Sequence, residues 1–165
     1  MIDCIAIGDS LAVGVGHARP GCFIAAITGV TSERYVHIFP GMRHVRTAII
    51  SLGVNDSEDI GTAENLLRLR QQVRADRVFW LLTGGNPRAR EAVHEVAGRF
   101  GDRLIDAAPL TGPDHVHPGR DGYARLAALT TGGAAPAPGL VTHRAAAGPK
   151  VWNGPYSLNG VRVQR

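Results

Sequence analysis

The sequence predicts an α/β fold in which helices cover both faces of a parallel sheet. Two observations predict it: short apolar runs have the length of buried strands, and stretches with helical spacing separate them. Regular alternation of strands and helices implies right-handed crossovers, so the carboxyl ends of the strands meet at one edge of the sheet. Ligands of such sheets bind outside that edge. The five expected strands are residues 2–7, 22–27, 47–52, 78–82 and 104–105.

Each strand is bounded by residues that favour turns, and the helices between them have their own signals. The apolar runs are bounded by Gly, Asp or Asn. Leu66, Leu69 and Val73 recur at helical spacing and share one face. Pro87 suits the first turn of a helix, where its missing N–H costs nothing. The helices identified in this way are residues 62–74, 88–100 and 122–129.

The composition changes after Thr131, and we expect one domain over residues 1–131. The segment that follows reads GGAAPAPG, which is typical of a linker. Farther on, two short alternating runs flank Asn159-Gly160, a strong signal for a β-hairpin. We therefore read residues 132–165 as a linker and a basic tail with a hairpin. A short hairpin cannot bury its own apolar side chains, so residues 150–165 are a candidate contact with a second copy or a larger assembly.

The way the net charge of +4 is distributed along the chain argues against a nucleic-acid partner. Residues 1–131 hold 14 Lys and Arg against 14 Asp and Glu, so the excess belongs to the tail. Its cations are spread out and form no basic stripe of the kind that binds DNA or RNA. These cations are Arg144, Lys150, Arg162 and Arg165.

The amino terminus and the two cysteines bear on location. No basic stretch precedes an apolar one, and no segment approaches the roughly 20 apolar residues that span a bilayer. We expect no signal peptide, no membrane span and a cytoplasmic location by default, with export by another route or within an assembly left open. Cys4 and Cys22 have no CxxC spacing, so we expect two small buried hydrophobic side chains and neither a disulfide framework nor a zinc site.

Ser10 lies where a nucleophile is useful. The segment Gly8-Asp9-Ser10-Leu11 directly follows the first strand, which places Ser10 at a strand-to-helix turn on the carboxyl edge. A helix N-terminus supplies backbone N–H groups that stabilise an oxyanion. The alternative is that Ser10 only caps the first helix, as Ser residues in this position commonly do.

A second loop at the same edge supplies a base. The segment Asp114-His115-Val116-His117-Pro118 lies between the fifth strand and the last helix. A carboxylate three residues before a histidine can fix its tautomer, so that the other ring nitrogen faces Ser10. The alternatives are a turn with a solvated histidine, or Asp114, His115 and His117 as metal ligands. No further ligand cluster completes a metal site, and we expect none.

Two further loops could stabilise an oxyanion. Gly29 follows the second strand and could present a bare backbone N–H, and Asn55 follows the third strand and could present its side-chain amide. Together with the N–H of Ser10 they would make three donors. Taken singly, Gly29 is more often a turn glycine and Asn55-Asp56 a helix cap.

The joint pattern resembles the GDSL, or SGNH, hydrolase family. The matching blocks are Gly8-Asp9-Ser10-Leu11, Gly29, Gly53-Val54-Asn55-Asp56 and Asp114 to Pro118. The resemblance covers nearly all of residues 1–131 and implies a flavodoxin-like three-layer α/β/α sandwich with a five-stranded parallel sheet. It also implies ester hydrolysis through an acyl-enzyme, without cofactor or metal. Ser10 would be the nucleophile, Asp114 and His117 would complete the triad, and Ser10, Gly29 and Asn55 would form the oxyanion hole.

Loop length suggests the kind of ester. Strands and helices occupy most of residues 1–131, so short loops should leave an open cleft that favours short acyl groups, acetyl first. With the resemblance, this points to an O-acetylated carbohydrate or another small ester as the substrate. The alternatives are a lysophospholipase or thioesterase of the same fold, or a non-catalytic binding module that docks through its C-terminal hairpin.

Overall fold

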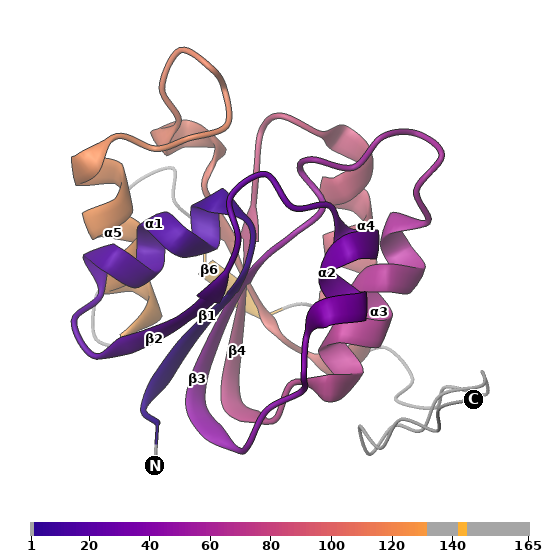
Figure 1. The fold of residues 1–165 in the computed structure, drawn as a ribbon. Helices are drawn as coiled ribbons and strands as arrows, with labels where there is room; N and C mark the ends of the chain where they lie inside the picture. Colours follow the sequence, from indigo (N-terminus) through magenta and orange to yellow (C-terminus); the bar gives the residue numbers. More distant parts are fainter. Residues whose placement is uncertain (1, 132–141, 145–165) are drawn as a thin grey trace.

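The computed structural model describes residues 2–131 and 142–144, which form one twisted sheet between two layers of helices (Figure 1). The strand order is β2-β1-β3-β4-β5-β6, and the first five strands run parallel. The order 2-1-3-4-5 is that of flavodoxin-like sheets, which confirms the predicted fold class. The strands are β1 (Cys4–Gly8), β2 (Cys22–Ala26), β3 (Val45–Ser51), β4 (Ala75–Leu82), β5 (Arg103–Asp106) and β6 (Thr142–Arg144).

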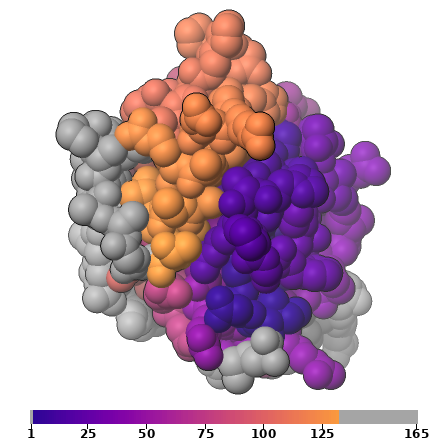
Figure 2. Space-filling model, turned by 90° about the vertical axis from the view of Figure 1, so that its left-hand side faces the viewer, coloured from indigo at the N-terminus to yellow at the C-terminus, as the bar shows by residue number. Residues whose placement is uncertain are grey.

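The helices divide into two groups with separate cores. Side chains alternate across the sheet, so Ile50 and Trp80 face one layer of helices while Ile49 and Phe79 face the other. Helices α2 (Ser32–Ile38), α3 (Thr62–Gln72) and α4 (Pro87–Phe100) cover the first face (Figure 1). Helices α1 (Ser10–Ala18) and α5 (Arg120–Thr130) lie side by side on the second, seen at the front of Figure 2.

The predicted elements appear close to their expected positions. Leu66 and Leu69 are buried on the inner face of α3, and Val73, which directly follows the helix, is buried in the same core. Asn86 caps α4 by accepting a hydrogen bond from the backbone N–H of Ala89, and Pro87 occupies the first turn. None of the helices in the described part of the chain is long and apolar enough to cross a bilayer.

Three elements are additions to the prediction: α2, β6 and the short 3₁₀ helix η1 (Ala108–Leu110). The short helix α2 has only seven residues, too few to show a helical period in the sequence. Strand β6 lies within the segment that we read as linker and tail, and it pairs antiparallel with β5. The hairpin expected around Asn159-Gly160 lies outside the described residues.

The prediction for the cysteines was wrong in two respects. Cys4 is buried as expected, but Cys22 is only partly buried, and the two form a disulfide. They are direct partners in the parallel ladder between β1 and β2, with their Cα atoms 4.5 Å apart. The expectation rested on the absence of a CxxC motif, which recognises only cysteines that are close in sequence. Here the β1-α1-β2 crossover brings the starts of two strands together across 18 positions of sequence.

Candidate active site

The turn between β1 and α1 places Ser10 at the carboxyl edge of the sheet. Gly8 has a φ of 121°, and a Cβ there would lie 1.8 Å from the carbonyl oxygen of Ser51, so this close approach requires glycine. The N–H of Asp9 donates to the Ser51 carbonyl at 2.8 Å. Asp9 is the N-cap of α1, and its Oδ1 accepts from the N–H of Leu11 at 3.0 Å. Ser10 therefore begins the helix instead of capping it, and its side chain is left for other contacts.

The loop before α5 projects from the top of the molecule (Figures 1 and 2) and is shaped by its own hydrogen bonds. The N–H of Gly112 donates to the carbonyl of His117 at 2.8 Å. Oδ1 of Asp114 accepts from the backbone N–H groups of Val116 and His117, at 3.0 and 2.9 Å. A Cβ on Gly85 would lie 2.6 Å from Cγ2 of Val116, so glycine at this position lets the loop pack over the end of β4.

These two segments bring the predicted nucleophile, base and orienting carboxylate into one chain of contacts. Oγ of Ser10 lies 2.8 Å from Nε2 of His117. Nδ1 of His117 lies 2.6 Å from Oδ2 of Asp114. A carboxylate on Nδ1 holds the proton there, so that Nε2 can take the hydroxyl proton. The arrangement can therefore activate a serine hydroxyl for attack on a carbonyl carbon.

Asp114 remains ionised over the whole working range of pH. The backbone N–H of His117, the N–H of Val116 and the His117 ring, in that order, hold the pKa of this carboxyl well below its usual range. One oxygen of the carboxylate therefore shapes the loop, and the other orients the ring. The side chains of His117 and Asp114 are 46% and 52% exposed, so the site is open to solvent.

The expected oxyanion donors lie on the loops that follow β1, β2 and β3. Gly29 is exposed with a φ of 74°. The side-chain amide of Asn55 donates one hydrogen to the carbonyl of Val30 at 3.0 Å, which draws the loop after β3 toward Gly29. An amide nitrogen has a second hydrogen to offer. Ser10 begins α1, and the first N–H groups of a helix have no acceptor within it. The role of all three as oxyanion donors stays a prediction.

A hydrogen-bond network around Asp56 supports these loops. The Asp56 carboxylate accepts from the N–H and the hydroxyl of Ser32, at 2.7 and 2.5 Å, and from the Thr62 hydroxyl at 2.8 Å. The side-chain amide of Asn86 donates to the backbone carbonyls of Asp56 and Gly53. Asp56 thus ties together the loops after β2, β3 and β4. The sequence around Asn55-Asp56 predicts only a helix cap or a family motif, because the partners of Asp56 are remote in the sequence.

Asp9 is a second residue whose environment the sequence does not predict. Its side chain is fully buried beside Ser10. Burial raises the pKa of Asp9 to about 7, although Ser51, the N–H groups of Leu11 and Ala12, and the charge of His117 act in the opposite direction. The sequence contains no local signal for this, since burial of one carboxyl follows from the packing of β1, β3 and α1.

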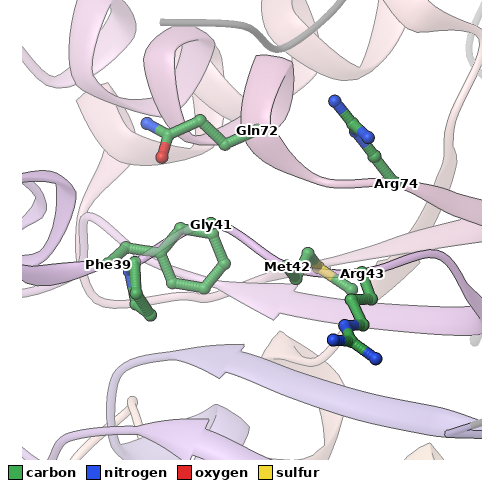
Figure 3. A pocket seen from close by; sticks show the side chains of 7 residues that line it. Phe39, Gly41, Met42, Arg43, Gln72 and Arg74 are labelled. Atoms are coloured by element: carbon green, nitrogen blue, oxygen red, sulfur yellow. The ribbon is translucent and has the colours of Figure 1, made fainter. Parts of the chain in front are cut away.

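A cavity of about 630 Å³ lies away from this site (Figure 3). Its walls are the segment that leads into β3 and the segment that joins α3 to β4, so it opens at the amino edge of the sheet. Phe39 and Met42 lie on one side, with Gln72 and Arg74 on the other. It shares no lining residue with the triad.

Comparison with known proteins supports the fold and leaves the activity open. No family model matches this chain, and no curated protein matches it. The chain is similar to a solved structure of the C-terminal catalytic domain of Streptococcus pneumoniae peptidoglycan O-acetyltransferase A (OatA), which carries a methylsulfonyl adduct. The TM-score is 0.52 and the identity 19%, over 79% of this chain and 90% of the other. A second solved structure has a TM-score of 0.58 and 15% identity, over 80% and 96% of the two chains. At these identities the likeness shows a shared α/β/α fold.

Proposed function

We propose that this protein is a serine esterase that removes short acyl groups, acetyl in particular, through an acyl-enzyme on Ser10. The observation that carries the proposal is the chain of contacts from Ser10 through His117 to Asp114, with 2.8 Å and 2.6 Å between the polar atoms. A serine bonded to a histidine that a carboxylate orients is the arrangement that activates hydroxyl nucleophiles in unrelated folds.

The reaction proceeds in two halves. Oγ of Ser10 bonds to the ester carbonyl carbon while its proton passes to Nε2 of His117. The carbonyl oxygen becomes an oxyanion that the N–H groups of Ser10 and Gly29 and the amide of Asn55 stabilise. The carbon–oxygen bond to the alcohol then breaks, and the alcohol leaves with the proton from His117. Water attacks the acyl-Ser10, gives a proton to His117, and the acid is released as that proton returns to Oγ.

An acetyl group on a carbohydrate is the substrate that we favour. Both His117 and Asp114 are about half exposed, which suits a bulky alcohol that remains in solvent. An open site buries little of a long acyl chain, so the binding free energy of about 0.8 kcal/mol per buried CH₂ group is not gained. The name of the OatA neighbour refers to acetyl transfer on peptidoglycan, a carbohydrate polymer, which agrees with this substrate class.

Acetyl transfer to a sugar hydroxyl is the second candidate, and the same neighbour favours it. The first half-reaction is identical. In the second half a carbohydrate hydroxyl replaces water, loses its proton to His117 and takes the acyl group from Ser10. The two activities therefore differ only in the acceptor, and they can be separated by product analysis.

The test uses a series of p-nitrophenyl esters with acetyl, butyryl, octanoyl and palmitoyl groups. We expect kcat/KM to be highest for acetate and to fall along the series. A rise toward the long chains would move the assignment to a lipase or thioesterase. Addition of an oligosaccharide acceptor should leave acetate as the main product if hydrolysis dominates, whereas an O-acetylated sugar would indicate a transferase. Failure of folded protein to react with a serine-directed phosphonate at Ser10 would reject both and favour a binding module.

A further inference from the structure

Asp9 is a buried carboxyl of which one oxygen accepts a well-formed hydrogen bond and the other does not. Oδ1 caps α1 through the N–H of Leu11. In the described part of the chain neither Oδ2 of Asp9 nor Oγ of Ser51 has a well-formed hydrogen bond, and both residues are fully buried. The Ser51 hydroxyl lies near the Asp9 carboxylate without forming a well-formed hydrogen bond to it. A buried carboxylate with so few hydrogen bonds is costly, so its retention beside Ser10 calls for an explanation.

The polar and titratable side chains that interact with Asp9 come from β3, α2, α5 and the loop before α5. Ser51 lies at the end of β3, and its side chain favours the ionised form of Asp9. Nε2 of His117, from the loop before α5, lies 2.8 Å from Oγ of Ser10, the residue next to Asp9, and a positive charge on the ring also favours the Asp9 carboxylate. Tyr35 on α2 and Tyr123 on α5 are close enough for the Asp9 charge to raise the pKa of each phenol, after the larger effect of burial. His117 is therefore the cation that faces Asp9 when the ring is protonated.

We propose that Asp9 is a positioning residue that assists the reaction of the preceding section in two ways. Its cap fixes Ser10 in the first turn of α1, and its ionised carboxylate stabilises the positive charge that His117 acquires on taking the Ser10 proton. Asp114 stabilises that charge from the Nδ1 side, and Asp9 adds to it from its buried position next to Ser10 in the chain. The inference rests on the proposed function, because it assigns Asp9 a part in that same step.

The assistance depends on pH, since only ionised Asp9 supplies the charge. Burial brings the titration of Asp9 to about pH 7. Below that pH the neutral carboxyl still caps α1 but no longer stabilises the imidazolium. The reaction should therefore gain rate as Asp9 ionises, in addition to the gain from having His117 neutral.

The experiment compares Asp9→Asn with the unmodified protein across pH 5 to 9, using p-nitrophenyl acetate with subtraction of spontaneous hydrolysis. Asn keeps an oxygen for the cap and has no charge at any pH. We expect Asp9→Asn to be slower in kcat by on the order of tenfold near pH 8.5, with the ratio approaching one below about pH 6. KM should change little. Asp76→Asn is the matched control, because Asp76 is exposed and pairs with His44 at the other edge of the sheet, and it should keep the full rate.

A purely structural role for Asp9 would give a ratio that is the same at every pH, and this result would overturn the proposal. Ser51→Ala is the second variant in case Asp9→Asn fails to fold. It removes a group that favours ionised Asp9, so the acid limb of the pH profile should move upward, and an unchanged profile would also overturn the proposal.

The phosphonylation rate of Ser10 separates this inference from the proposed function. It needs the nucleophile and base but no ester turnover. Absence of labelling at every pH rejects the function and the inference with it. Labelling with a pH-independent ratio between Asp9→Asn and the unmodified protein rejects the role of Asp9 alone.

Discussion

Removal of the Cys4–Cys22 disulfide should destabilise the protein by about 3 kcal/mol. The bond joins positions 18 residues apart, and in the chain-entropy description a loop of that length restricts the unfolded chain by roughly this amount. The change to test is Cys4→Ala with Cys22→Ala. Cys4 is buried at 1% exposure, so the removal of its sulfur adds a small packing loss to the entropic effect.

The assay is urea unfolding of the oxidised protein, the reduced protein and the double variant. The oxidised protein should contain no titratable thiol after denaturation, and its midpoint should exceed those of the other two, with little difference in slope between the reduced protein and the double variant. Specific activity under native conditions should persist in the double variant. Gly29 follows the carboxyl end of β2, and the parallel pairing of Gly8 with Ala26 holds that end independently of the disulfide.

Two titratable thiols in protein purified under oxidising conditions would refute the reasoning. So would equal unfolding midpoints with and without reductant. A loss of activity as large as the loss of stability would show that the disulfide also shapes the loop that contains Gly29.

Four further predictions concern the site. Ser10→Ala should lower kcat by at least about 10³-fold in folded protein, and near-normal turnover would reject Ser10 as the nucleophile. Asn55→Ala should lower kcat by roughly 100-fold to 1,000-fold with little change in KM, since the donor acts mainly in the transition state; a loss confined to KM would make Asn55 a binding residue. Asp114→Asn should leave the circular dichroism unchanged, because its oxygen can still accept the loop N–H groups, yet lower kcat by on the order of 10³-fold as His117 takes the wrong tautomer. The last concerns stability. Folding raises the pKa of Asp9 from about 3.8 to about 7, so the folded state binds this proton more tightly than the unfolded state does. The resulting contribution to the free energy of unfolding is complete below about pH 3.8 and is lost as the pH rises through about 7. At pH 8 the free energy of unfolding of Asp9→Asn should thus exceed that of the unmodified protein by up to about 4 kcal/mol, seen as a higher urea midpoint. The difference should disappear near pH 4.

The fold could be predicted from the sequence because each of its parts has a local signal. Apolar runs bounded by turn residues gave the five parallel strands, and Leu66 and Leu69 gave the inner face of α3. Strand β6 had no such signal, since three residues that include His143 and Arg144 show no apolar alternation. Its pairing depends on the free edge of β5, which is a property of the assembled sheet.

The approach of Ser10 to His117 could be expected for the same reason, although 107 positions separate them. Both follow strands of one parallel sheet, and parallel strands end at the same edge, so topology replaces sequence proximity. The disulfide obeys the same geometry at the opposite edge, where Cys4 and Cys22 begin neighbouring strands. It was missed because β2 could have paired with another strand, and the sequence does not specify strand order.

The environment of Asp9 is harder to predict, because it depends on how β1, β3 and α1 pack around this one side chain. A motif such as Gly8-Asp9-Ser10-Leu11 predicts a turn and a candidate nucleophile, but the Asp9 side chain could equally have pointed to solvent as an ordinary helix cap. Its burial follows from the contact between Gly8 and Ser51, which presses the turn against the end of β3. Burial of the Asp9 carboxyl raises its pKa toward neutrality, although the Ser51 side chain acts in the opposite direction. The ionised form is therefore costly to the fold and useful to the reaction, so Asp9→Asn should raise stability and lower kcat together at pH 8. A loss of stability at pH 8 in Asp9→Asn would contradict the argument that ionised Asp9 destabilises the fold.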